Sequence, residues 1–271
     1  MDWNKVKTIL IIALIILNIC LFTYVYVFNG GNGSNENMLT VSRVEEILSE
    51  KNISINCTVP NDSISLPSLD IKFKTMTPTK ELINNFLENY VGVISDENTS
   101  YSQGQETLNI IGNKKLEYVN ASINNANGEA SIIDIAKDYC QEKNIDISNY
   151  VLEVFNNEDS VEVAFTKQFK NYKLDNSYVR FYFVDKNITK IQIQEIEEIA
   201  EKAQVQAVSA VEALLRLMSY EDVSNKEITA IELCYFTAED QDFLQITSTN
   251  TKPVWKVKFS DNSYKYLYSM D

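Results

Sequence analysis

Histidine is absent from this chain of 271 residues. Its absence excludes Ser-His-Asp and Cys-His nucleophile pairs, zinc sites with histidine ligands, a phosphoacceptor histidine and a histidine-based pH switch. The many carboxylates form no recognisable acid and base pair in the sequence alone. From the residues alone we therefore expect no catalytic residues, no metal and no cofactor.

Cysteine is also scarce. Three of the four cysteines, Cys57, Cys140 and Cys234, are spread widely along the chain, which fits neither a disulfide framework nor a C-x-x-C site. Cys140 falls on the apolar face of a predicted helix and Cys234 lies inside a predicted strand. We expect these cysteines to be buried among apolar side chains, and the sequence leaves open whether all three are free.

Basic residues are outnumbered, with 24 Lys and Arg against 38 Asp and Glu, so the net charge is −14 and the pI about 4.6. An acidic surface repels phosphate backbones and anionic lipid headgroups. We therefore expect no nucleic acid partner, and a domain that stands off the membrane surface. The hydrophobic content of 45% is typical of folded globular proteins.

One long stretch has no charge at all. Residues Thr8 to Phe28 contain no Asp, Glu, Lys or Arg, and about 20 residues at ~1.5 Å each cross the ~30 Å hydrocarbon layer as a helix. The run is longer than the apolar region of a cleavable signal peptide and lacks small residues before a cut, so we interpret it as a retained anchor. Lys5 and Lys7 precede it, and Arg43 is the first positive residue after it, which predicts a cytoplasmic N-terminus and an extracytoplasmic remainder.

The chain divides into four parts by this interpretation. Residues 1–28 form a short cytoplasmic tail and transmembrane helix, and residues 29–38, which hold three of the seven glycines, form a flexible linker. Residues 39–127 and 128–271 form two extracytoplasmic subdomains. In the second, a helix followed by long strands recurs, so the predicted fold is α+β, with helices packed on antiparallel sheets and two similar subdomains.

Hydrophobic periodicity predicts the individual elements. A helix capped by Thr40 or Ser42 continues to about residue 51, and another begins at Thr77-Pro78 with proline as its first helical residue. Further helices are expected over 130–143 and along the apolar stripe 205–218. The predicted strands are 53–59, 69–75, 106–111, 115–122, 151–155, 161–169, 178–184, 189–196, 226–237, 254–259 and 264–268, with a hairpin turn at Gly112-Asn113. Three tyrosines on one face of the last strand are expected to be core or half-buried: Tyr264, Tyr266 and Tyr268.

Both ends of the chain resemble one known family. The opening MDWNKVKTI, the Ile16-Leu17-Asn18 step inside the apolar run, and the segments SAVEALL (209–215), IEL (231–233) and PVW (253–255) resemble the YycI family. Members are membrane-anchored accessory regulators of the WalK (YycG) sensor histidine kinase in Gram-positive bacteria. The resemblance implies that the span packs beside the transmembrane helices of the kinase, with a YycH-like protein in the same complex, and tunes cell-wall homeostasis signalling. It also implies the residues that dock the helix: Trp3, Lys5, Lys7 and Asn18.

The residues themselves agree with such a role, because a tail this short can influence the cytoplasm only through contacts in the bilayer. Asn18 is an amide at membrane depth, where a partner helix could satisfy it, although it could equally face lipid or bond its own backbone. Two alternatives stay open. One is an anchored extracytoplasmic hydrolase, which needs a cleft with two carboxylates or a Ser–Lys pair, and the other is a non-catalytic envelope assembly module. The sequence gives neither the sign of regulation, nor the signal sensed, nor the oligomeric state.

Overall fold

The computed structural model describes residues 40–61, 64–95, 99–120, 131–157, 159–239 and 242–268. Within these ranges, no helix is both long and apolar enough to cross a membrane. The predicted span, the predicted linker and the four predicted docking residues lie outside the described residues: Trp3, Lys5, Lys7 and Asn18.

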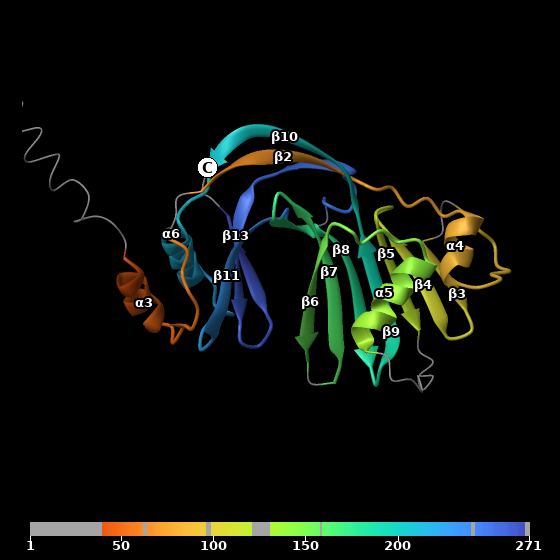
Figure 1. The fold of residues 1–271 in the computed structure, drawn as a ribbon, viewed down its shortest axis with the longest axis horizontal. Helices are drawn as coiled ribbons and strands as arrows, with labels where there is room; N and C mark the ends of the chain where they lie inside the picture. The colour runs from red at the N-terminus through yellow and green to blue at the C-terminus, as the bar shows by residue number, and fades with distance from the viewer. Residues whose placement is uncertain are drawn as a thin grey trace, which may run out of the picture.

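The fold is α+β and strands dominate it (Figure 1). The helices are α3 (Val41–Ser49), α4 (Lys80–Phe86), α5 (Ile132–Glu142) and α6 (Ala210–Leu214), the last continued by the 3₁₀ turn η2 (Leu215–Ser219). The strands are β1 (Ser54–Ile55), β2 (Ser65–Phe73), β3 (Ser100–Gln103), β4 (Glu106–Ile111), β5 (Lys115–Asn120), β6 (Tyr150–Asn156), β7 (Val161–Phe169), β8 (Tyr172–Val184), β9 (Asn187–Gln194), β10 (Ile196–Gln206), β11 (Glu227–Tyr235), β12 (Ser248–Thr251), β13 (Pro253–Phe259) and β14 (Tyr264–Leu267).

The strands form two sheets. The larger has the order β14-β13-β11-β8-β9-β5-β4-β3, with β1 beside β11 and the β6–β7 hairpin beside β8. Its two halves meet where β11 pairs with β8 in parallel, through only two residue pairs, Cys234 with Lys173 and Tyr235 with Leu174. All the other strand pairs of this sheet are antiparallel except β1–β11. The short junction divides the molecule into two lobes.

We name these lobes by their position relative to α3, the first helix that the structure describes. The proximal lobe consists of α3, α6, β1, β11, β13 and β14, and the distal lobe consists of α4, α5 and β3 to β9. The second sheet, β10-β2-β12, forms an arch over both lobes (Figure 1). Each part has its own buried cluster: Val44, Leu214 and Trp255 belong to the proximal core, Phe181 and Ile191 to the distal core, and Leu69, Phe73 and Tyr235 to the core beneath the arch.

Local capping explains where the helices begin. Thr40, Thr79, Ser131 and Ser209 each accept a hydrogen bond from the backbone N–H three residues later, which satisfies one free donor of the first turn. Thr40, rather than Ser42, therefore caps α3. The prediction that Pro78 is the first residue of its helix is wrong, because Thr79 is the cap and Lys80 is the first helical residue.

The strand predictions are partly confirmed. The hairpin at Gly112-Asn113 and the bounds of β7 agree with the structure. The prediction of a helix along the apolar stripe 205–218 is wrong at its start, because β10 extends to Gln206 and α6 begins only at Ala210. Predicted strand 53–59 is reduced to the two-residue β1. Strand pairing joins β2 to β10 and β5 to β9, across the predicted subdomain boundary at residue 127, and that boundary stays a prediction.

The cysteine predictions can also be compared with the structure. Cys140 on α5 and Cys234 on β11 are both buried, as predicted, whereas Cys57 is only partly buried. All three are free thiols. Burial raises the pKa of the Cys140 thiol to about 12 and that of Cys234 well above its ordinary value, which is typical of inert core cysteines.

Candidate functional site

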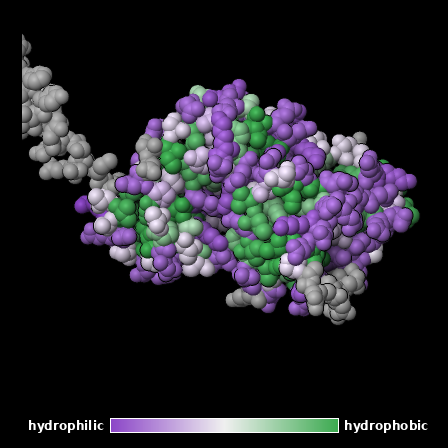
Figure 2. Space-filling model, in the orientation of Figure 1, coloured by the Kyte–Doolittle hydropathy of each residue, from purple (hydrophilic) through white to green (hydrophobic). Residues whose placement is uncertain are grey.

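The distal sheet has one apolar and one polar face. Val163, Phe165 and Phe181 point to the face that α5 covers, where hydrophobic side chains gather around β6, β7 and α5 (Figure 2). Because side chains alternate along a strand, the residues between them point to the opposite face. Strand register aligns Glu153 of β6, Ala164 of β7 and Arg180 of β8 in one row across that face. The result is a row in which a small side chain separates a carboxylate from a guanidinium.

A cleft of about 190 Å³ lies over this row. One wall consists of residues from β6, β7 and β8, among them Glu162, Arg180 and Tyr182. The other wall comes from the β13–β14 hairpin of the proximal lobe and includes Lys256 and Tyr264. The cleft is thus an interlobe site, and its four charged lining residues are two acids, Glu153 and Glu162, and two bases, Arg180 and Lys256.

Arg180 and Glu162 form the charged pair of the distal wall. Their side chains are only 22% and 18% exposed, and Arg180 Nε lies 3.7 Å from Glu162 Oε1, beyond ordinary hydrogen-bond distance. The guanidinium also lies over the Tyr178 ring, 4.0 Å from its centroid. Burial raises the pKa of Glu162 despite the opposing effect of Arg180. This long contact compensates the burial of two charges incompletely.

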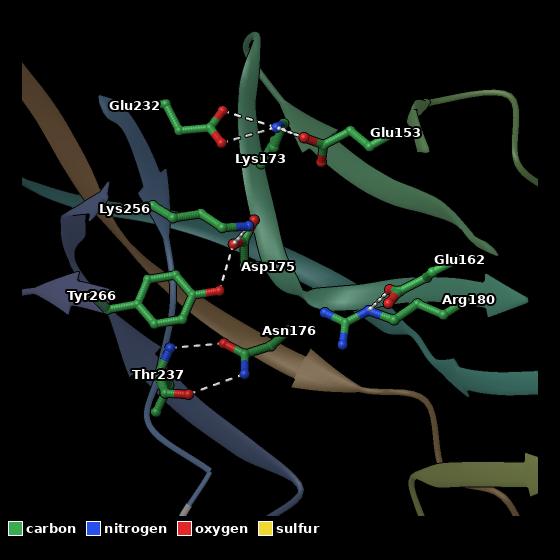
Figure 3. A network of polar contacts seen from close by, with 10 residues as sticks. All are labelled: Glu153, Glu162, Lys173, Asp175, Asn176, Arg180, Glu232, Thr237, Lys256 and Tyr266. Atoms are coloured by element: carbon green, nitrogen blue, oxygen red, sulfur yellow. Dashed lines mark hydrogen bonds and ion pairs between the residues drawn. The ribbon is translucent and has the colours of Figure 1, made fainter. Parts of the chain in front are cut away.

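A second polar cluster lies directly behind the cleft, where the lobes meet (Figure 3). Asp175, which is 2% exposed, accepts from the ammonium of Lys256 at 2.7 Å and from the hydroxyl of Tyr266 at 2.6 Å, both on the same oxygen. Burial lowers the pKa of Lys256, but the Asp175 carboxylate outweighs burial and the net pKa is raised. Burial and Asp175 together raise the pKa of Tyr266. This ion pair ties β13 and β14 to β8 across the lobe junction.

Two further contacts strengthen the same junction. Lys173 Nζ lies 2.8 Å from Glu153 in the distal lobe and 2.8 Å from Glu232 in the proximal lobe. Asn176 donates to the carbonyl of Thr237 at 3.0 Å and accepts from its backbone N–H at 2.7 Å. Because only two residue pairs of backbone join the lobes here, these side chains supply much of the polar pairing at the junction.

The charged side chains of the cleft are paired with one another or with neighbouring charges. Glu153 is held by Lys173 and Glu162 faces Arg180, so both carboxylates of the cleft are engaged by cations. A Ser–Lys contact does exist, because Lys226 Nζ lies 2.8 Å from Ser263 Oγ. Lys226 Nζ also lies 2.8 Å from Asp261 Oδ2, so the lysine contacts a carboxylate as well as the serine hydroxyl. Among the residues in the six described ranges, no group of three or more Cys, Asp or Glu could hold a metal ion.

The predicted docking residues lie outside the described ranges, so the structure does not test them. The sequence did single out the tyrosines of the last strand, and the structure corrects their expected packing: Tyr264 and Tyr268 are 42% and 38% exposed, while the partly buried Tyr266 bonds Asp175. The other cleft residues gave no sequence signal, because strand register alone brings Glu153, Ala164 and Arg180 together.

Comparison with known proteins shows which family model matches the chain and which solved structures have a similar fold. The family model described as YycI protein matches residues 31–268. No curated protein matches this chain. Among solved structures it is similar to YycH from Bacillus subtilis, with 12% identity and a TM-score of 0.53 over 78% of this chain and 54% of that one, so the chain spans about half the length of that structure. At this identity the likeness shows the fold alone.

Two other solved structures are more distant. An uncharacterized protein from Eubacterium rectale ATCC 33656 has 13% identity and a TM-score of 0.45, over 86% of this chain and 96% of that one. The C-terminal domain of YpeB from Bacillus megaterium has 8% identity and a TM-score of 0.30, over 70% of this chain and 96% of that one. Since the family model covers residues 31–268 of 271, the chain belongs to the YycI family.

Proposed function

We propose that this protein is a membrane-anchored accessory regulator of a WalK/YycG-type sensor histidine kinase. It tunes cell-wall homeostasis signalling through transmembrane helix contacts with the kinase and with a YycH-like partner, and its role involves no catalysis. The observation that carries the proposal is membership of the YycI family over residues 31–268. The fold likeness to YycH is consistent with it.

The uncharged run Thr8–Phe28 supports the anchoring part of the proposal. It is long enough to cross the bilayer once, with Lys5 and Lys7 on the cytoplasmic side and the two extracytoplasmic subdomains outside. A regulator that acts through its span can bias a kinase only if that span has different affinity for two arrangements of the kinase helices. Trp3, Lys5, Lys7 and Asn18 are the residues proposed to make those contacts.

The test is co-purification from membranes. The span, residues 1–38 with an affinity tag, is expressed with a WalK-type kinase, and we expect it to retain the kinase after solubilisation. Asn18→Leu is expected to weaken the association by about 1 kcal/mol, or roughly fivefold, because the amide loses its interhelical partner. Cys20→Leu, a neighbouring substitution that keeps the amide, is the matched control.

The outcomes separate the alternatives. A span that never retains the kinase would overturn the mechanism, whereas full retention by Asn18→Leu removes only Asn18 from the contact. If deletion of residues 39–271 abolished function while kinase output stayed normal, an envelope assembly role would replace the regulatory one.

A further inference from the structure

We propose that the interlobe cleft binds a small zwitterion, namely an amino acid or short peptide with a free carboxylate and a free ammonium. This inference is independent of the regulatory role proposed above, because it stands on the geometry of the cleft alone. It assigns the ligand carboxylate to Arg180 and the ligand ammonium to Glu162 and Glu153.

The charge pattern defines the ligand class. The lining carries two carboxylates and two cations, so its net charge is zero and neither a polyanion nor a polycation is favoured. Within one row opposite charges are separated, since Glu153 and Arg180 lie on either side of Ala164, whereas Glu162 is the acid that faces Arg180. A ligand with one charge of each sign can complement both ends of such a row.

Arg180 is oriented to accept a carboxylate. A guanidinium has five donors in a planar fork, and its terminal edge matches a carboxylate with two parallel hydrogen bonds. Only Nε faces Glu162, and the terminal nitrogens lie on the side away from it (Figure 3). Glu162 is the one carboxylate in ion-pair contact with Arg180 among the residues that the structure describes. The guanidinium carbon lies 4.0 Å from the centroid of the Tyr178 ring, and Tyr182 forms a side-chain hydrogen bond with Arg180, so two contacts restrain the side chain.

The acidic end is suited to an ammonium. Glu162 is 18% exposed and its nearest cation atom, Arg180 Nε, lies 3.7 Å away, so a bound ammonium could approach it more closely, and the raised pKa that burial gives Glu162 agrees with this. Glu153 is 25% exposed and shares Lys173 with Glu232, so it can still accept from a ligand. Each carboxylate is contacted by one cation, Glu153 by Lys173 and Glu162 by Arg180, and since an ionised carboxylate has about four acceptor sites, each can also accept from a ligand ammonium.

The volume limits the size of the ligand. Clefts for drug-sized molecules measure roughly 300–1,000 Å³, and this cleft of about 190 Å³ is smaller. Ala164, which is 3% exposed, forms its floor among larger neighbours. The hydroxyl-bearing ring of Tyr264, 42% exposed, marks the side that opens to solvent. A single amino acid or a dipeptide is the class that fits.

The experiment measures calorimetric binding of alanylalanine to the full chain in detergent micelles. Two probes lack one charge each, N-acetyl-alanylalanine without the ammonium and alanylalanine amide without the carboxylate. We expect the zwitterion to bind at least about tenfold more tightly than either, because each loses a charge-assisted hydrogen bond. Equal binding of all three probes, or no heat from the zwitterion at millimolar concentration, would overturn the proposal.

Three variants locate the binding. Arg180→Gln removes the carboxylate partner, and Ala164→Leu fills the cleft while every charge is kept, so both are expected to weaken binding about tenfold or more. Lys202→Gln is the matched control, because it removes an exposed cation paired with Asp70 on the arch. Circular dichroism checks that each variant is folded. If Arg180→Gln fails to fold, Ala164→Leu decides, since zwitterion binding unchanged in that variant places the site elsewhere.

Discussion

The contact between the β4–β5 turn and the chain after β11 can be tested with a pair of glycines. Gly112 has φ +56°, and a Cβ added there would meet the carbonyl oxygen of Leu244 at 2.3 Å. Gly104, in the β3–β4 turn, has φ +63° and nothing within 4 Å of an added Cβ. The two positions therefore share backbone strain and differ in the neighbouring backbone, so Gly104→Ala is the matched control for Gly112→Ala.

The expected difference in Tm between the two variants follows from two free-energy costs. A left-handed conformation costs a non-glycine residue about 1–2 kcal/mol, which both variants incur. Gly112→Ala must also displace the Leu244 backbone, and overpacking of this kind costs about 1–3 kcal/mol more. For a protein of this size each kcal/mol lowers Tm by about 2–4 °C, so Gly112→Ala should melt about 2–12 °C below Gly104→Ala.

The displaced segment is held by a buried lysine. Lys114, 1% exposed, donates to the carbonyls of Phe243 and Ile246, the latter at 2.8 Å, and lies over the Phe243 ring. Burial lowers the pKa of Lys114, so its ammonium depends on those carbonyls for compensation. Thermal unfolding followed by circular dichroism gives both Tm values, and hydrogen exchange over residues 242–247 reports the local effect. Equal Tm values for the two variants would show that the turn and Leu244 do not touch in solution.

Three further predictions concern other parts of the fold. Pulse alkylation mapped by mass spectrometry should label Cys57 well before Cys140 and Cys234, because the latter two are buried with raised pKa values, and equal rates would contradict their burial. The pKa of Asp261 is lowered to about 2 by hydrogen bonds from its lysine and serine partners, so its stabilisation is present above pH 3.8 and is lost as pH falls toward 2. Since that carboxylate is 50% exposed, Asp261→Asn should lower the free energy of unfolding by under about 1 kcal/mol at pH 7, and by less at pH 3, in urea titrations. A larger loss at pH 3 than at pH 7 would contradict the lowered pKa of Asp261. Trp255→Phe should cost about 1–3 kcal/mol in the same assay, because the backbone carbonyl now bonded by the buried indole at 2.8 Å loses its donor, and an unchanged midpoint would deny that bond.

Local chemistry made part of the fold predictable from the sequence. The Gly112-Asn113 turn was found because both residues adopt positive φ, 56° and 53°, which these residue types tolerate best. Strand β10 was not predicted, because its local sequence does not favour a strand. Its residues 197–204 are mainly Glu, Ala, Lys and Gln, which favour a helix, and antiparallel pairing with β2 overrides that preference.

The cleft was beyond sequence analysis because its two walls are separated along the chain. Glu162 and Arg180 belong to β7 and β8, whereas Lys256 belongs to β13 in the other lobe. Each residue alone is an ordinary polar position on a strand. Only the register of β6, β7 and β8 shows that Ala164 is the small residue at the centre of a charged row.

The attachment of α3 decides whether this helix can move relative to the rest of the proximal lobe. Val44 and Leu48 of α3 are both fully buried in the proximal core, and burying two such side chains stabilises the contact by about 3–6 kcal/mol. Coupling free energies between sites in regulated proteins are typically about 1–3 kcal/mol. A coupling free energy of that size is smaller than the free energy that holds α3 in the core. We therefore expect α3 and the rest of the proximal lobe to move as one body. The β13–β14 wall of the cleft belongs to that same lobe, and the Arg180 wall belongs to the other. The three residues assigned to the proposed ligand, Arg180, Glu162 and Glu153, all belong to the distal lobe, so binding there would leave the attachment of α3 unchanged.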